Sequence, residues 1–150
     1  MKKYIGCKML EAEPAYKIGD KIVPIRPNMG CGTKEQLGYK VKYPDGYESW
    51  SPKEVFEKAY MQVGDNNSIT PEIVDNFIKN VEIQTMGNKT TVVMVTLVNG
   101  YVITKSSSCV DEKNYDEKIG AEICMEKVKD DIWMLLGFLL QTAFKGVKGE

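Results

Sequence analysis

The stretch from Asn114 to Phe144, NYDEKIGAEICMEKVKDDIWMLLGFLLQTAF, most constrains what this chain can fold into. Its acidic start, Asp116 and Glu117, suits the positive end of a helix dipole. Large apolar residues recur in it at spacings of three and four, the period of one helix face. They are Ile119, Ile123, Val128, Ile132, Leu135, Leu136 and Leu139. The pattern predicts one long helix.

The second half of this helix is apolar on every side, since each residue from Ile132 to Leu140 except Gly137 is large and apolar. Such a helix must be buried all round. A small sheet covers one side, so we expect a helix of another copy on the other, approaching closely at Gly137. A core helix without a partner is the alternative. A membrane segment is disfavoured, because the apolar run is about 13 residues where a span needs roughly 20.

Composition excludes several classes of function. A chain of 150 residues predicts one compact domain, or one with a small appendage. The net charge of −1 and a single arginine, Arg26, argue against DNA binding. The absence of histidine excludes Ser-His-Asp and Cys-His catalysis and most zinc sites. The four cysteines form no CxxC pair, so we expect reduced thiols in the cytoplasm and no metal or cofactor.

The first 62 residues predict a strand–hairpin–helix module. Residues 2–13 alternate like a strand, and residues 14–37 are expected to be mostly loop, with a short strand at 21–23 and a glycine-rich surface turn at 30–32. A hairpin follows at 38–50, around the turn Pro44-Asp45-Gly46. Ser51-Pro52 is a typical helix start, with Ser51 as the cap, and this helix is expected to reach Tyr60.

Residues 63–70 are expected to be a linker, and residues 71–150 an α+β ligand-binding domain. Thr70-Pro71 predicts a second capped helix, running to Asn80. Strands are predicted at 81–85, 90–98 and 101–105, and Asn99-Gly100 is a strong hairpin signal between the last two. The fold class is therefore α+β, a small antiparallel sheet packed against the long C-terminal helix.

The connection from Ser106 to Tyr115 holds most of the convergent polar groups. Its three serines, in front of a helix N-terminus, can hold a phosphate. Tyr101 and Tyr115 offer faces for a base, and Asp111 can accept from ribose hydroxyls. Lys105, Lys127 and Lys129 can neutralise a diphosphate. In the alternative interpretation this is only a polar loop, in which Asp111 or Asn114 caps the helix and the tyrosines pack.

An enzyme is the other class considered. The same region carries acidic side chains that could act as a glycosidase-like pair, although no spacing marks one. They are Asp111, Glu112, Asp116, Glu117 and Glu122. Cys109 or Cys124 as a nucleophile would lack a histidine partner. The sequence therefore favours a protein with no catalytic residue.

From about Val81 to Leu140 the chain resembles a family of small phage and prophage proteins. The matching features, in order, are Thr90-Thr91, Leu97-Val98-Asn99-Gly100-Tyr101, Ser108-Cys109-Val110-Asp111, Asn114-Tyr115-Asp116, Gly120, Ile132-Trp133 and Leu136-Gly137-Phe138. This family includes the Thoeris anti-defence sponges, which bind a cyclic ADP-ribose signal and hold it away from its effector. The first 60 residues, ending in YPDGYESWSPKEVFEKAY, resemble another recurrent phage module.

The resemblance implies a sponge that sequesters its nucleotide intact in the cytoplasm of an infected or lysogenic bacterium. It also implies cyclic di- or trinucleotides as possible further ligands, and a dimer or hexamer formed through the C-terminal helix. No DNA or membrane partner is implied. The implied ligand residues are Asn99, Tyr101, Ser106, Ser108, Asp111, Asn114, Tyr115, Lys129 and Asp131. A phage structural or regulatory protein acting through protein contacts is the alternative.

Overall fold

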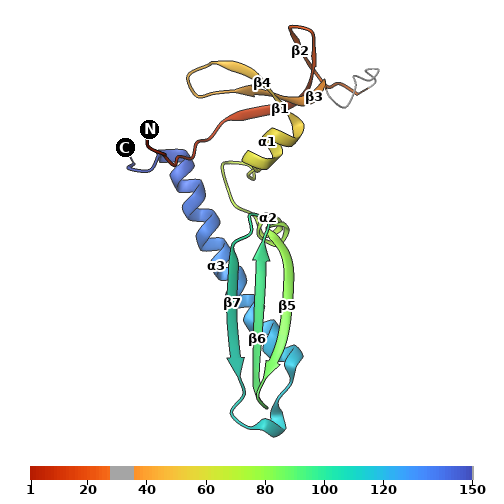
Figure 1. Cartoon of the computed structure of the whole chain (residues 1–150), viewed down its shortest axis with the longest axis vertical. Helices are drawn as coiled ribbons and strands as arrows, with labels where there is room; N and C mark the ends of the chain where they lie inside the picture. The colour runs from red at the N-terminus through yellow and green to blue at the C-terminus, as the bar shows by residue number, and fades with distance from the viewer. Residues whose placement is uncertain (28–35, 150) are drawn as a thin grey trace. The chain divides into compact units, whose positions relative to one another are not determined.

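The computed structural model describes residues 1–27 and 36–149, which form two compact units (Figure 1). One unit comprises residues 1–62 together with 142–150, and the other comprises residues 63–141. The predicted glycine-rich turn at 30–32 lies outside the described residues. No helix in the described part of the chain is long and apolar enough to cross a membrane.

The first unit is a four-stranded antiparallel sheet in the order β2-β1-β3-β4. The strands are β1 (Glu11–Ile18), β2 (Lys21–Pro24), β3 (Leu37–Lys42) and β4 (Glu48–Pro52), followed by the short helix α1 (Lys53–Ala59). The expected strand at residues 2–13 is wrong over most of its length, because the first strand begins at Glu11. The cap expected from Ser51 is also wrong, because Pro52 is the N-cap of α1 and makes no side-chain cap bond.

Little of the first unit is fully buried. Ala15 and Val41 are its buried apolar side chains among the described residues. Trp50 lies across Gly38, where an added Cβ would come within 2.7 Å of the indole, and its Nε1 donates to the Ala15 carbonyl at 3.3 Å. On the opposite face of the sheet, Phe56 of α1 stacks on Tyr39 with 4.3 Å between ring centroids. Aromatic contacts therefore supply much of the packing that a larger core would provide.

Tyr39 makes the first unit sensitive to high pH. Its hydroxyl donates to Glu57 Oε1 at 2.9 Å. That hydrogen bond, together with burial and the negative charge of Glu57, raises the pKa of Tyr39. The folded state thus holds the phenolic proton more tightly than the unfolded chain, where tyrosine titrates near pH 10. This contribution to stability is present below about pH 10 and is lost as the pH rises through the folded-state pKa.

Tyr39→Phe is therefore expected to lower the free energy of unfolding by about 0.5–1 kcal/mol at pH 7, because it removes one half-exposed hydrogen bond and keeps the ring stack. Urea unfolding of parent and variant should converge as the pH rises from 10 through the raised pKa of Tyr39, because the parent then loses the proton that makes this hydrogen bond. A difference that stays constant from pH 7 to pH 12 would contradict this assignment.

The second unit is the predicted α+β fold. Its elements are α2 (Pro71–Asn76), β5 (Ile78–Met86), β6 (Thr90–Leu97), β7 (Val102–Ser108), the 3-10 helix η2 (Glu112–Asn114) and α3 (Glu117–Lys145). The three strands form an antiparallel sheet in the order β5-β6-β7, and α3 passes obliquely behind it (Figure 1). The α+β class, the Asn99-Gly100 turn and the Thr70 cap are confirmed. The second helix ends four residues earlier than predicted, because Ile78 already pairs with Leu97 in the sheet.

The core of the second unit lies between β6 and α3. Every second residue of β6 is buried, and the same face meets a stripe of α3 at spacings of three and four. The buried set is Val74, Thr91, Val93, Val95, Leu97, Ile103, Gly120, Ala121, Cys124, Val128, Ile132 and Leu136. Gly120 has no side chain because Thr91 occupies the space, and a Cβ there would lie 2.7 Å from Thr91 Cβ.

The far side of α3 is not buried, although its sequence predicts burial all round. Five apolar side chains of α3 between residues 133 and 139 stay at least one-third exposed, and we call them the C-terminal apolar surface. They are Trp133, Met134, Leu135, Phe138 and Leu139. Gly137 lies among them, and nothing within 4 Å would obstruct a Cβ there. One three-stranded sheet is too narrow to cover a helix of 29 residues on more than one side.

Candidate functional site

The predicted ligand residues do not form one pocket within a chain. Asn99 and Tyr101 lie at the β6–β7 turn, where the Asn99 side chain accepts from the Tyr101 amide at 3.0 Å. Ser108 lies at the other end of β7, seven residues along. At about 3.3 Å per residue, these two ends are more than 20 Å apart. A mononucleotide-sized ligand held at one end of β7 does not reach the other in the same chain.

Lys129 and Asp131 also point to different sides of α3, because residues two apart do not share a helix face. Lys129 pairs with Asp75 of α2 at 2.8 Å, beside β5. Asp131 pairs with Lys105 of β7 at 2.7 Å, at the opposite margin of the sheet. Of these two predicted residues, only Asp131 lies near the serines of β7.

The polar groups that do come together lie along the margin formed by β7. Ser106 and Ser108 point to the sheet face away from α3, as Thr90 of β6 does, and Ser108 and Thr90 share a hydrogen bond of 2.9 Å. The Lys127 ammonium reaches from α3 to the Ser106 carbonyl at 3.4 Å. Lys89 donates to the Val110 carbonyl at 3.3 Å, just beyond Ser108. We call these five residues the β7 polar cluster.

The β7 polar cluster suits an anion with hydroxyl groups, such as a nucleotide phosphate. Hydroxyls donate or accept, and lysine contributes a point charge to a phosphate oxygen. Sequence reasoning overlooked Lys89 and Thr90. The signal was available in the hairpin at Asn99-Gly100, because pairing 90–97 with the strand that follows places Thr90 opposite Ser108.

The N-terminus of α3 does not offer the free donors that the sequence predicts. Asp116 caps the helix, and its Oδ1 accepts from the amides of Lys118 at 2.8 Å and Ile119 at 3.2 Å. An anion at this position would compete with a carboxylate already in place. The cap is Asp116, not Asp111 or Asn114. Asp111 instead caps η2 by accepting from the Lys113 amide at 3.0 Å, and the Asn114 amide donates to the Asp111 carbonyl.

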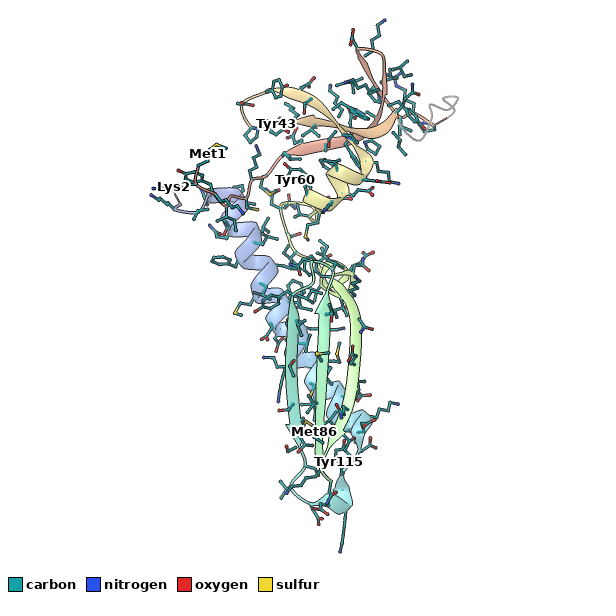
Figure 2. The ribbon with its side chains drawn as sticks, viewed as in Figure 1. Met1, Lys2, Tyr43, Tyr60, Met86 and Tyr115 are labelled. Atoms are coloured by element: carbon teal, nitrogen blue, oxygen red, sulfur yellow. The ribbon has the colours of Figure 1, made fainter. Side chains whose placement is uncertain are left out.

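Tyr115 uses its hydroxyl inside the fold. It lies at the end of the sheet where β5 turns at Met86 (Figure 2). Its hydroxyl is 2.7 Å from Thr85 Oγ1 and 2.9 Å from Thr91 Oγ1, and Thr85 also donates to Glu117. Thr91 is completely buried, so Tyr115 satisfies a hydroxyl that water does not reach. This is a structural role, as in the alternative interpretation of a polar loop in which the tyrosines pack.

Several of the carboxylates and thiols considered for catalysis are occupied in the same way. Asp111 and Asp116 are caps, and Glu117 accepts from Thr85. Cys124 of α3 is fully buried against β6, where its thiol points to the Thr91 carbonyl. Within residues 1–27 and 36–149 no three acidic or cysteine side chains gather closely enough to hold a metal ion.

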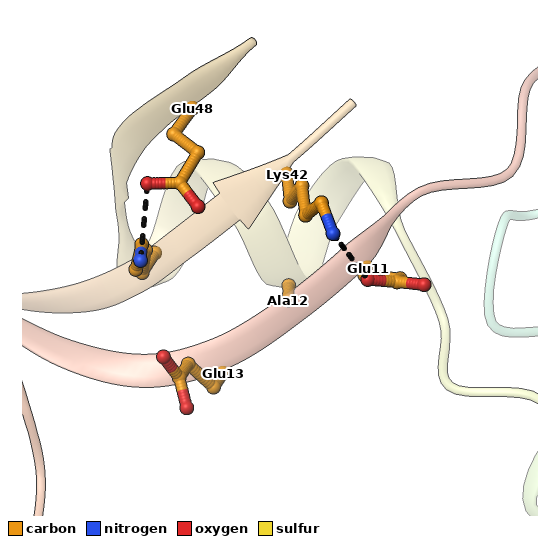
Figure 3. A pocket seen from close by; sticks show the side chains of 6 residues that line it. Glu11, Ala12, Glu13, Lys42 and Glu48 are labelled. Atoms are coloured by element: carbon orange, nitrogen blue, oxygen red, sulfur yellow. Dashed lines mark ion pairs between the residues drawn. The ribbon is translucent and has the colours of Figure 1, made fainter. Parts of the chain in front are cut away.

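A separate groove lies on the open face of the N-terminal sheet (Figure 3). It has a volume of about 280 Å³ and is lined by Glu11, Ala12, Glu13, Lys40, Lys42 and Glu48. Lys40 pairs with Glu48 at 3.0 Å and Lys42 with Glu11 at 3.7 Å, as expected of neighbours on adjacent strands. Three carboxylates against two ammonium groups do not favour an anion, so this groove is a poor site for a nucleotide.

Comparison with known families decides the ancestry of the chain. A family model described as phage protein (N4 Gp49/phage Sf6 gene 66) matches residues 69–144, which covers the whole of α2, the three-stranded sheet and nearly all of α3. The chain belongs to this phage protein family. Neither the curated proteins nor the solved structures contain a match. Membership in the N4 Gp49/Sf6 gene 66 family supports the expected phage origin. The match does not extend to the sponge identity.

Proposed function

We propose that this protein binds a cyclic nucleotide immune signal of the cyclic ADP-ribose type, holds it intact, and so blocks Thoeris signalling in an infected or lysogenic bacterium. Cyclic di- or trinucleotides are further candidate ligands. The observation that carries the proposal is the β7 polar cluster, where three hydroxyls and two ammonium groups border one strand. Sequestration requires no acid, base or metal, which fits a region whose carboxylates serve as caps and hydrogen-bond acceptors.

The separation of Tyr101 from the serines supports a site shared between copies. If the base stacks on Tyr101, which is more than half exposed, the phosphates must meet the β7 polar cluster of another chain. The C-terminal apolar surface offers a way to hold copies together, and assembly through α3 as a dimer or hexamer is part of the proposal.

Lys127→Met is expected to weaken binding of the cyclic nucleotide by about tenfold or more, because one charge-assisted contact contributes roughly 1.5–3 kcal/mol. Lys118→Met is the matched control, since it makes the same charge change on the same helix at a residue outside the β7 polar cluster. Calorimetric titration of both variants checks the assignment. Equal losses in the two would mean that only overall charge matters and would remove Lys127 from the site.

A second candidate is a phage structural or regulatory protein that acts through protein contacts. The C-terminal apolar surface favours it, because exposed apolar patches mark protein interaction sites. A partner protein that purifies with the chain, in a preparation with no nucleotide absorbance, would support this candidate over the sponge.

A further inference from the structure

The two margins of the three-stranded sheet are closed differently. At the β7 margin the Lys127 ammonium lies on the Ser106 carbonyl, and Lys105 pairs with Asp131 of α3. Lysine beside an edge strand is a common means of preventing another strand from pairing there. The β7 margin is thus guarded by side chains of the chain itself.

The β5 margin carries no such cover within the described residues. Side chains from Lys79 to Gln84 are all exposed, and among the described strands β5 pairs with β6 alone. The irregularity between Ile78 and Asn80 removes Lys79 from the ladder, and Asn80 to Met86 then pairs regularly with β6. This regular segment contains no proline and one charged side chain, Glu82. It presents an outer row of backbone N–H and C=O groups.

The inner face of β5 is apolar and open. Val81 is 38% exposed and Ile83 48% exposed, on the face that α3 covers at β6. They are open because α3 starts beside β5, at the Glu117–Thr85 contact, and then crosses toward β7, where Asp131 meets Lys105 (Figure 1). The oblique helix leaves room beside the middle of β5 for a second apolar surface.

We propose that β5 pairs antiparallel with β5 of a second copy of this chain, so that two three-stranded sheets join into one of six strands. A two-fold axis normal to the sheet places one residue opposite itself. Ile83 is the midpoint of the regular segment Asn80–Met86, so centring on Ile83 uses the whole of it. Both copies of α3 then lie on the same face of the joined sheet.

The side chains favour this register and a second copy as the occupant. Centring on Ile83 places Glu82 opposite Gln84 of the partner subunit, an amide that donates to the carboxylate. It also brings the two exposed Ile83 side chains together. Centring on Glu82 would oppose two carboxylates, centring on Gln84 would set Glu82 against Met86, and centring on Val81 would run into the irregularity at Lys79. The segment is therefore complementary to itself in one register.

Ile83→Lys tests the pairing because it places two ammonium groups opposite each other. The matched control is Val102→Lys, on the other margin and the other face, where the native side chain is also 48% exposed. Both changes are made in a Met134→Glu background, which suppresses association through the C-terminal apolar surface. Sedimentation of the background protein should give a dimer, Ile83→Lys should halve the mass, and Val102→Lys should leave it unchanged.

Disulfide trapping gives the register. Ile83→Cys should form a covalent dimer under mild oxidation, since directly opposed residues have Cβ atoms about 4.5–5.5 Å apart, while Gln84→Cys and the parent cysteines should not. A monomeric Met134→Glu protein, or a dimer unaffected by Ile83→Lys, would overturn the proposal and leave β5 for a different chain. The inference does not rest on the proposed function, and neither measurement involves a nucleotide.

Discussion

Gly120→Ala is expected to lower the free energy of unfolding of the second unit by roughly 2–6 kcal/mol. An added Cβ would lie 2.7 Å from Thr91 Cβ and also contact Thr91 Oγ1, and Thr91 is on the central strand, where the backbone has little freedom. Overpacking of this kind costs about 1–3 kcal/mol. Rotating Thr91 to relieve it would break its bond to Tyr115, and a buried hydroxyl without a partner costs a further 1–3 kcal/mol or so.

Gly137→Ala is the matched control for Gly120→Ala. It is the same substitution on the same helix, but apart from the adjoining backbone of α3 itself, no described atom lies within 4 Å of the new Cβ. Alanine is a better helix former than glycine by about 1 kcal/mol, so this variant should be slightly more stable. Urea unfolding is compared in the Met134→Glu background, where association through the C-terminal apolar surface does not contribute. Similar effects at both positions would contradict the close packing of Gly120 on Thr91.

Ile132→Ala is expected to cost about 2–5 kcal/mol, because Ile132 is fully buried between α3 and the sheet and truncation leaves a cavity. This is a large part of the stability of a small domain, which is typically about 5–15 kcal/mol. Thermal and urea unfolding of the variant provide the measurement. A loss at the larger value would leave part of the protein unfolded at 37 °C.

The control for Ile132→Ala is Ile119→Ala on the exposed face of the same helix, where the native side chain is 56% exposed. Its expected cost is below about 1 kcal/mol, since surface substitutions away from special features change stability little. If the two variants were equally destabilised, the orientation of α3 on the sheet would be wrong.

The C-terminal half of this fold was predictable because its local signals agree. β6 alternates, Asn99-Gly100 specifies a hairpin, and the stripe of α3 repeats with helical period. The first strand was predicted too early in the chain, because proline is typical of loops and Pro14 lies inside β1. In the structure the β1–β2 ladder ends at Ala15 and Pro24, and just beyond it the Pro14 carbonyl accepts from the Ile25 amide at 3.1 Å. A proline at such an edge-like position costs no ladder bond.

The candidate site was less predictable than the fold. Residue types in the connection from Ser106 to Tyr115 suggest a ligand, but helix caps and buried networks use the same types. Asp116 and Tyr115 illustrate this, since one caps α3 and the other satisfies Thr91. The distance along β7 from Tyr101 to Ser108 follows from strand geometry, yet whether a second copy closes that gap depends on surfaces that a single sequence does not mark.

The most direct test of the central claim is calorimetric titration of the purified full chain with glycocyclic ADP-ribose, followed by heat denaturation and chromatography of what is released. Tight binding and recovery of the unaltered nucleotide are the predicted results. Tight binding with recovery of a changed nucleotide would mean catalysis and contradict sequestration. Absence of binding, to this nucleotide and to cyclic di- and trinucleotides alike, would contradict the sponge and favour the protein-partner candidate.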